Sequence, residues 1–227
     1  MAPLKAFILT LCIVLLGASC KEDSARKHPV NPNTVVQVAS PDDALAQLKE
    51  GNKRFVDGDM MNTDYKAQRE ATKDDQHPYA IVLSCMDARI PPEIVFDQRL
   101  GDLFVIRVAG NVEDSNMLGS IEYAVKAKNI KLILMMGHSN CGAVKGCIDN
   151  VQYGNLTQLV AQIKPAITGD TTNKKAMIEA TVKNNVRLTM GRILQKSDII
   201  AAAVKENKVK IAGAYYDLAT GQVEFLQ

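Results

Sequence analysis

The stretch YAIVLSCMDAR, residues 79–89, gives the clearest indication of the fold, because an apolar run ends abruptly in thiol and charged side chains. Such a short continuous apolar run predicts a strand that is buried on both faces. Three similar runs follow, at Leu103 to Val108, Lys131 to Gly137 and Val209 to Tyr215. Helical patterns lie between them, at Pro92 to Phe96, Leu118 to Ala127, Leu156 to Ile167 and Lys174 to Gln195. Strands that alternate with helices predict an α/β fold with a mostly parallel central sheet flanked by helices.

Cap and turn signals mark both ends of this region. Ser40 can cap a helix, Pro41 suits its first position and two acidic residues follow, which predicts a helix that runs to about Val56. Near the other end, Gly221 separates two extended segments and predicts a turn that returns an antiparallel C-terminal edge strand. We therefore expect one folded domain over residues 40–227.

Composition agrees with a single globular domain. The chain has 227 residues, of which 47% are hydrophobic and 23% are charged, so disordered, collagen-like and disulfide-scaffold proteins are excluded. Lys and Arg total 27 against 25 for Asp and Glu, which gives a net charge of +2. Because no dense basic run is present to neutralise phosphates, we expect no nucleic-acid partner.

Residues 1–19 have the organisation of a secretory signal peptide. Lys5 is their only charge, an apolar run extends from Ala6 to Leu16, and small residues precede Cys20. This apolar run is too short to span a bilayer comfortably. The end of the segment resembles the lipobox of bacterial lipoproteins, in which the cysteine is acylated, although Gly17 stands where the lipobox usually has leucine. Plain secretion and an uncleaved membrane anchor are the alternatives.

Residues 20–39 form a second region, which is polar, contains Pro29 and Pro32 and shows no periodicity. These features predict a flexible tether. The first 39 residues together predict an exported protein, periplasmic or an outer-membrane lipoprotein, with exposure at the cell surface left open. Contact with a membrane would then be through an N-terminal lipid anchor on Cys20 only.

Chemically active side chains follow the first predicted strand. Cys85, Asp87 and Arg89 alternate along an extended segment, so their side chains can share one face. In open α/β sheets, ligands bind beyond the carboxyl ends of the strands, which is where this segment lies. A thiol, a carboxylate and a guanidinium therefore meet at a position that suits a binding site.

The third predicted strand ends in a similar way, with the sequence GHSNCG at residues 137–142. His138 and Cys141 stand at a predicted helix start, where the helix dipole favours a thiolate. Together with Cys85 they make a three-ligand set of the kind that holds catalytic zinc with one position open. A disulfide between Cys85 and Cys141 is the alternative in an exported protein, but it leaves the neighbouring Asp, Arg and His unexplained.

Cys85-x-Asp87-x-Arg89 followed by His138-x-x-Cys141 is the double signature of the beta-class carbonic anhydrases, and the chain resembles this family from about Ser40 to its C-terminus. The surrounding segments are similar as well: Gly51 to Phe55, Gly101 to Phe104 and Arg107 to Asn111. The resemblance implies a beta-carbonic-anhydrase-like fold. It also implies one Zn2+ per chain, bound by the two cysteines and the histidine, and reversible hydration of carbon dioxide to bicarbonate and a proton by zinc-bound hydroxide.

The resemblance assigns roles to other residues too. Asp87 would accept a hydrogen bond from the zinc-bound water while Arg89 holds it off the metal, and in the closed state of some members this aspartate binds zinc itself. Gln98 matches a glutamine that reaches the substrate side of the pocket, often from across a dimer interface, so a homodimer or larger homo-oligomer is expected. The chain contains no Trp, so the non-catalytic bicarbonate pocket that involves a tryptophan in some members is not expected.

Three other functions remain open at this point. A hydrolase of carbonyl sulfide or carbon disulfide would use the same zinc site. A non-catalytic lipoprotein with structural or sensory zinc would have no need of Asp87, Arg89 and Gln98. A thiol redox protein would need a labile Cys85–Cys141 disulfide in place of the metal. The remaining cysteine of this region, Cys147, does not fit the ligand set and is expected to be a buried packing residue.

Overall fold

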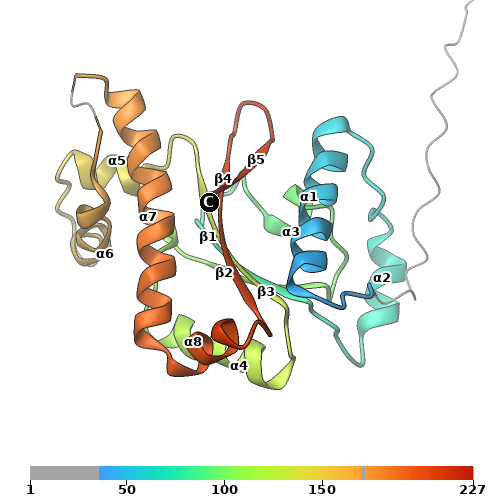
Figure 1. The fold of residues 1–227 in the computed structure, drawn as a ribbon. Helices are drawn as coiled ribbons and strands as arrows, with labels where there is room; N and C mark the ends of the chain where they lie inside the picture. Colours follow the sequence, from blue (N-terminus) through green and yellow to red (C-terminus); the bar gives the residue numbers. More distant parts are fainter. Residues whose placement is uncertain (1–35, 170–171, 227) are drawn as a thin grey trace, which may run out of the picture.

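The computed structural model describes residues 36–169 and 172–226, and its centre is a five-stranded sheet (Figure 1). The strands are β1 (Ala80–Ser84), β2 (Leu103–Arg107), β3 (Leu132–His138), β4 (Lys210–Tyr216) and β5 (Val223–Leu226). Their order across the sheet is β2-β1-β3-β4-β5. The first four strands are parallel and β5 runs antiparallel to β4. The α/β prediction with its antiparallel C-terminal edge strand is therefore confirmed.

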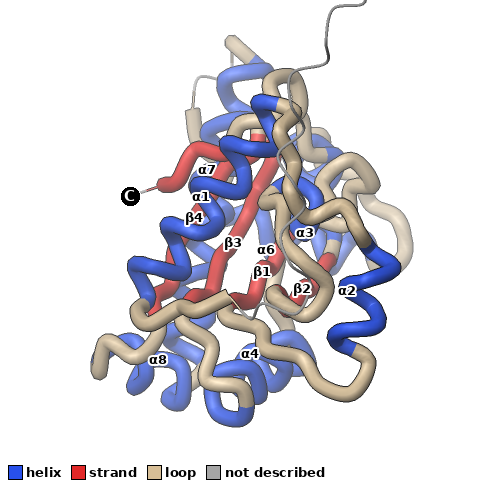
Figure 2. The backbone as a smooth tube through the Cα atoms, turned by 90° about the vertical axis from the view of Figure 1, so that its right-hand side faces the viewer, coloured by secondary structure: helices blue, strands red, loops and turns tan. Residues whose placement is uncertain are grey.

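Helices cover both faces of this sheet. They are α1 (Pro41–Asp57), α2 (Tyr65–Thr72), α3 (Pro92–Val95), α4 (Ser115–Ala127), α5 (Gly142–Ile148), α6 (Leu156–Ile163), α7 (Lys174–Lys196) and α8 (Asp198–Lys205), with 3-10 turns η1 (Ala109–Asn111) and η2 (Lys164–Ala166). Figure 1 shows α4, α7 and α8 on one side of the sheet and α1 and α3 on the other. Figure 2, turned by 90°, shows α1 lying over β3 and β4.

The core follows from the alternation of side chains along the strands. On one face, Ala80, Val82, Leu132 and Leu134 are buried in a cluster with Ala44 and Leu48 of α1. On the other face, Ile81, Leu83, Ile133 and Met135 are buried with Ile121 of α4, Ile193 of α7 and Ile200 of α8. Both faces of the central strands are thus covered, which explains why their sequences are continuously apolar.

Helix α1 begins as predicted. The Ser40 hydroxyl accepts from the Asp43 N–H at 3.1 Å, and the Asp43 carboxylate accepts from the Ser40 N–H at 2.9 Å, which completes a capping box. Gly58 ends the helix with a left-handed φ of 71°. Asn52 joins this helix to the C-terminal turn, because its amide donates to the Gly221 carbonyl at 2.9 Å and accepts from the Val223 N–H at 2.9 Å.

Two predicted features of the N-terminal segment lie outside the described residues, namely the signal peptide at 1–19 and the lipidated Cys20, together with most of the tether at 20–39. Across the described ranges, no helix combines the length and apolar character needed to cross a membrane.

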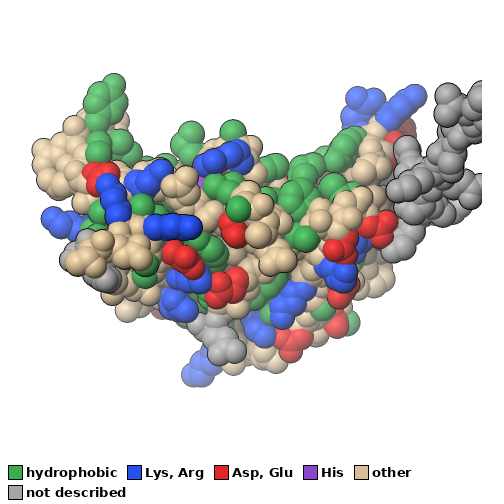
Figure 3. All heavy atoms as spheres, turned by 90° about the horizontal axis from the view of Figure 1, so that it is seen from above, with side chains coloured by type: hydrophobic (Ala, Val, Ile, Leu, Met, Phe, Trp, Pro, Cys, Tyr) green, Lys and Arg blue, Asp and Glu red, His purple; other side chains and the backbone are tan. Residues whose placement is uncertain are grey.

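The sheet topology determines where the functional side chains meet. In the register of β1 with β3, Ser84 pairs with Met136, so the carboxyl ends of the two strands are neighbours. The segments that follow these strands therefore emerge side by side at one edge of the sheet. Figure 3 views this edge from above, with basic, acidic and apolar side chains interspersed on the visible face.

Candidate metal centre

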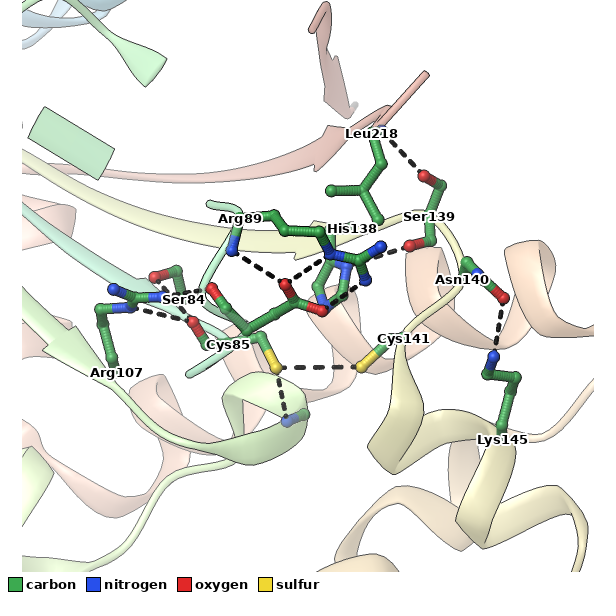
Figure 4. A network of polar contacts seen from close by, with 12 residues as sticks. Ser84, Cys85, Arg89, Arg107, His138, Ser139, Asn140, Cys141, Lys145 and Leu218 are labelled. Atoms are coloured by element: carbon green, nitrogen blue, oxygen red, sulfur yellow. Dashed lines mark hydrogen bonds and ion pairs between the residues drawn. The ribbon is translucent and has the colours of Figure 1, made fainter. Parts of the chain in front are cut away.

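Three potential ligand atoms converge at the carboxyl edge of the sheet. Cys85 directly follows β1, His138 ends β3, and Cys141 is the residue before α5. Their ligand atoms all lie within 4.8 Å of one another, and each residue is at most 5% exposed. Figure 4 shows the two sulfur atoms pointing toward each other, with His138 beside them. The structure brings the predicted ligand set together.

The two cysteines are free thiols. Their sulfur atoms are 4.0 Å apart, about twice the length of a disulfide bond at about 2.05 Å. Such a spacing leaves room for a cation between two sulfur ligands. The predicted alternative of a Cys85–Cys141 disulfide is not what the structure contains.

His138 is oriented for metal binding by its own backbone. Its Nδ1 lies 3.0 Å from the Ser139 carbonyl oxygen, which can only accept, so Nδ1 carries the proton. The lone pair is then on Nε2, a buried atom that has no hydrogen-bond partner among the described residues. An unpartnered buried nitrogen is costly. A metal ion at the group would satisfy it, and the Nδ1–H to carbonyl bond is the usual support of a metal-binding histidine.

The sulfur pair already favours one negative charge. The Cys141 thiol lowers the pKa of Cys85 by hydrogen bonding to it, and the Gly110 N–H acts in the same direction. The same sulfur–sulfur contact and burial raise the pKa of Cys141. Because two adjacent thiolates repel each other, the second proton leaves readily only when a cation is present.

Asp87 and Arg89 form the predicted pair at the rim of this group. Arg89 donates from Nε to Asp87 Oδ1 at 2.9 Å, from a terminal nitrogen to Oδ2 at 2.7 Å, and from its backbone N–H to Oδ1 at 3.0 Å. These bonds hold the pKa of Asp87 well below its usual range, so its carboxylate is charged at neutral pH. Asp87 Oδ2 lies 4.0 Å from His138 Nε2, within a short side-chain movement of the ligand atoms.

A second arginine supports the segment that carries these residues. Arg107, at the end of β2, donates from Nε to the Cys85 carbonyl at 3.2 Å and from a terminal nitrogen to the Asp87 carbonyl. It therefore fixes the backbone on both sides of Met86. The sequence assigns Arg107 no role, although the segment Arg107 to Asn111 is part of the resemblance; in the register of β1 with β2, Arg107 pairs with Ser84.

Gln98 does not join this group within one chain. Its side chain donates to the Phe96 carbonyl at 2.6 Å and accepts from the Tyr79 hydroxyl at 2.6 Å, and the residue is 5% exposed. Tyr79 precedes β1, at the opposite end of that strand from Cys85. A role for Gln98 at the substrate therefore requires a second copy of the chain, as the resemblance implies.

Cys147 stands apart from the three ligands. It lies on α5, is 7% exposed and belongs to the hydrophobic core. Burial raises the pKa of its thiol, which keeps it protonated and unreactive. Its place in the structure agrees with the predicted packing role.

Comparisons with known proteins agree with this arrangement. The sequence model of the family described as "Carbonic anhydrase" matches residues 80–223. A carbonic anhydrase of Mycolicibacterium smegmatis is 36% identical over 192 residues, covering 82% of this chain and 93% of that protein. Carbonic anhydrase 2 of Mycobacterium tuberculosis is 34% identical over 200 residues, covering 84% of this chain and 93% of that protein.

Solved structures show the same fold. A beta-carbonic anhydrase of Coccomyxa, solved with acetazolamide, is 25% identical with a TM-score of 0.64, and the match covers 80% of this chain and 86% of that one. One from Sordaria macrospora, described as tetrameric, is 25% identical with a TM-score of 0.63, and the match covers 68% of this chain and 83% of that one. The chain therefore belongs to the beta class of the carbonic anhydrases, which are carbonate dehydratases.

Proposed function

We propose that the protein catalyses reversible hydration of carbon dioxide to bicarbonate and a proton, with one zinc ion per chain held by Cys85, His138 and Cys141. The observation that carries the proposal is the buried, unpartnered Nε2 of His138 facing two free sulfurs. Two cysteines and one histidine are a known ligand set of catalytic zinc, which leaves a fourth position open. When bound, zinc supplies Lewis acidity that lowers the pKa of water from 15.7 towards about 7.

Asp87 orients the reactants. Its carboxylate is ionised and can only accept hydrogen bonds, so an O–H group beside it must direct its proton toward Asp87. The lone pair of that oxygen is then left free to face the carbon of carbon dioxide. Arg89 keeps the carboxylate in this place by binding both of its oxygens.

Arg89 also separates two states of the site. With its guanidinium bonded to Asp87, the fourth ligand position is open to water. If Asp87 leaves Arg89, its carboxylate can move the short distance to the ligand group and occupy that position itself. The arrangement in the structure is the one with Asp87 on Arg89, which is the open state of this proposal.

We propose further that the active form is a homodimer or a larger homo-oligomer. The β2 strand is an edge strand of the described sheet, with partly exposed Phe104 and Ile106 along it. The exposed ring of Tyr123 lies beside Phe104 at a tilted angle of 59°. An uncovered edge of this kind favours pairing with another chain. Gln98 would reach substrate from a second copy, after giving up its bonds to Tyr79 and Phe96.

Export stays a separate proposal that rests on residues 1–39 alone. The protein would be carried across a membrane by its signal peptide and anchored through acylated Cys20. Labelling of the protein with a fatty acid in cells tests this. Label that disappears in Cys20→Ala supports the anchor, and unlabelled wild-type protein contradicts it.

Ligand substitutions test the zinc proposal. Cys85→Ser and Cys141→Ser should each lose the metal and the hydration of carbon dioxide, because a neutral hydroxyl cannot replace a thiolate on zinc. Cys147→Ser is the matched control, since it removes an equally buried thiol outside the group and should keep both. Retention of zinc in Cys85→Ser or Cys141→Ser would overturn the ligand assignment.

The same samples should also be assayed with carbonyl sulfide, the substrate of the alternative function. Faster turnover of carbonyl sulfide than of carbon dioxide by the zinc-loaded wild type would favour the alternative hydrolase and contradict the proposed substrate.

A further inference from the structure

The short turn η1 lies directly behind the Cys85 sulfur. The backbone N–H of Gly110 in this turn donates to Cys85 Sγ at 3.4 Å, and Figure 4 draws a bond from the sulfur to this turn. A hydrogen bond to a thiolate stabilises its charge and weakens the sulfur as an electron donor to a metal. The position of the Gly110 N–H therefore affects the strength of a bond between Cys85 and a metal.

The turn has a backbone that needs support. Gly110 has φ 68° and ψ 15°, and the following Asn111 has φ 44°, so two successive residues are left-handed. That conformation is unfavourable for Asn, although less so than for most residues. A Cβ at Gly110 would lie 2.6 Å from Ile163 Cδ1, so the tip of that side chain would have to move to admit any other residue.

The support comes from the long helix α7. Asn185 Nδ2 donates to the Gly110 carbonyl at 2.7 Å, across 75 residues of sequence, and Asn185 is only 1% exposed. Gly110 is thus held at both ends, by Cys85 at its N–H and by Asn185 at its carbonyl. A buried amide on this helix face is costly unless it makes such a bond, because its neighbours Val182 and Val186 are apolar core residues.

Thr189 provides the contrast. It is one turn further along the same face of α7 and is 0% exposed, but its hydroxyl has no hydrogen-bond partner among the described residues. Both residues are buried polar groups on one helix, and Asn185 is the one bonded to the turn behind Cys85. The contact with Gly110 is what distinguishes them.

We infer that Asn185 is a positioning residue of the metal centre: it holds the Gly110 carbonyl so that the Gly110 N–H stays on the Cys85 sulfur, and it thereby sets the strength of the Cys85–metal bond. The inference rests on the proposed metal site and goes beyond it, because it places control of one ligand on a helix that contributes none of the three. Asn185 acts through Gly110, without touching metal or substrate.

The test uses the full chain loaded with Co2+, whose absorption reports on its sulfur ligands. Loss of the N–H···S bond raises the energy of the sulfur lone pairs, so the thiolate-to-cobalt charge-transfer band of Asn185→Leu should move to longer wavelength. Transfer of the metal to a competing chelator should become about 10-fold more favourable, because the loss of the Cys85 sulfur's fixed position outweighs its stronger electron donation; this is the lower end of effects seen when groups that hydrogen-bond to metal ligands are removed. Thr189→Val, the control, should match the wild type in both measurements.

Asn185→Ala provides the second variant, in case Leu disturbs folding. It removes the donor without adding bulk or charge, so it should show the same shift. The Gly110 amide proton should also exchange faster with solvent in both Asn185 variants. If both variants have the charge-transfer band at the wild-type wavelength and lose the metal to the chelator no more readily than the wild type, the inference is wrong. A wild type without thiolate-to-cobalt bands would instead refute the metal site on which it rests.

Discussion

Replacing Arg89 by alanine should convert the site from open to closed. Arg89 makes two side-chain bonds to Asp87, at 2.9 and 2.7 Å, and one backbone bond at 3.0 Å. Alanine removes the first two and keeps the third. Asp87 is then less strongly held at the rim, and its carboxylate moves onto the metal that we propose at Cys85, His138 and Cys141.

The size of this effect follows from the exposure of the pair. The Arg89 side chain is 58% exposed and the Asp87 side chain is 17% exposed, so solvent screens much of their attraction. An exposed ion pair contributes up to about 1 kcal/mol, whereas bonds to charged groups contribute about 1.5–3 kcal/mol when shielded. Because Arg89 is exposed, loss of this pair should shift the equilibrium toward the closed state by about tenfold at most.

Stopped-flow hydration of carbon dioxide measures the consequence. Arg89→Ala should keep its zinc and, with a tenfold shift, lose about twofold in rate if a tenth of the wild type is closed and about fivefold if half of it is closed. Arg89→Lys should lie between Arg89→Ala and the wild type, because it restores one charge and one bond. The loss should be largest near pH 6 and shrink toward pH 9, because Asp87 stays ionised throughout while more of the water that competes with it for the open position becomes hydroxide as the pH rises. An Arg89→Ala enzyme with full activity would refute the assigned role of the pair.

Two further predictions concern metal uptake and stability. Metal affinity should rise with pH. The Cys85 contact and burial raise the pKa of Cys141 in the metal-free protein, and the Cys141 proton must leave when the metal binds. Equal affinities at pH 6 and pH 8 in a chelator competition would contradict this. Gly51→Ala should lower the free energy of unfolding by about 3 kcal/mol, because a Cβ there would lie 1.7 Å from the Phe96 carbonyl oxygen. Gly191→Ala should instead raise the free energy of unfolding by about 0.5–1 kcal/mol, because a Cβ there would meet no neighbouring element within 4 Å. Thermal unfolding that ranks the two variants in the opposite order would show the packing argument to be wrong.

Much of the site could be predicted from sequence because its residues follow two buried strands. Cys85 and His138 stand at the ends of apolar runs, and parallel strands place such ends at one edge of a sheet. The same local reasoning ended the long helix at Gln195, close to the observed end of α7, but did not predict the short helix α8 that follows. Ser197 caps α8 by accepting a hydrogen bond from the Ile200 N–H at 3.3 Å.

Long-range contacts were beyond prediction from the sequence. Nothing near Asn185 indicates that its amide bonds to Gly110, 75 residues earlier in the chain. Nothing near Gln98 indicates that it turns toward Tyr79 at the far end of β1. Both contacts are set by how helices and loops pack on the sheet, and hydrophobic periodicity specifies which faces are buried without specifying which polar groups meet there.

Hydration of carbon dioxide and zinc content, measured on one reduced sample of the protein from about Asn33 onward, test the central claim most directly. We predict about one zinc per chain and fast hydration that disappears when zinc is removed by a chelator and returns when zinc is added back. A protein that binds no zinc at Cys85, His138 and Cys141, or that hydrates carbon dioxide equally fast after its zinc has been removed, would contradict the claim.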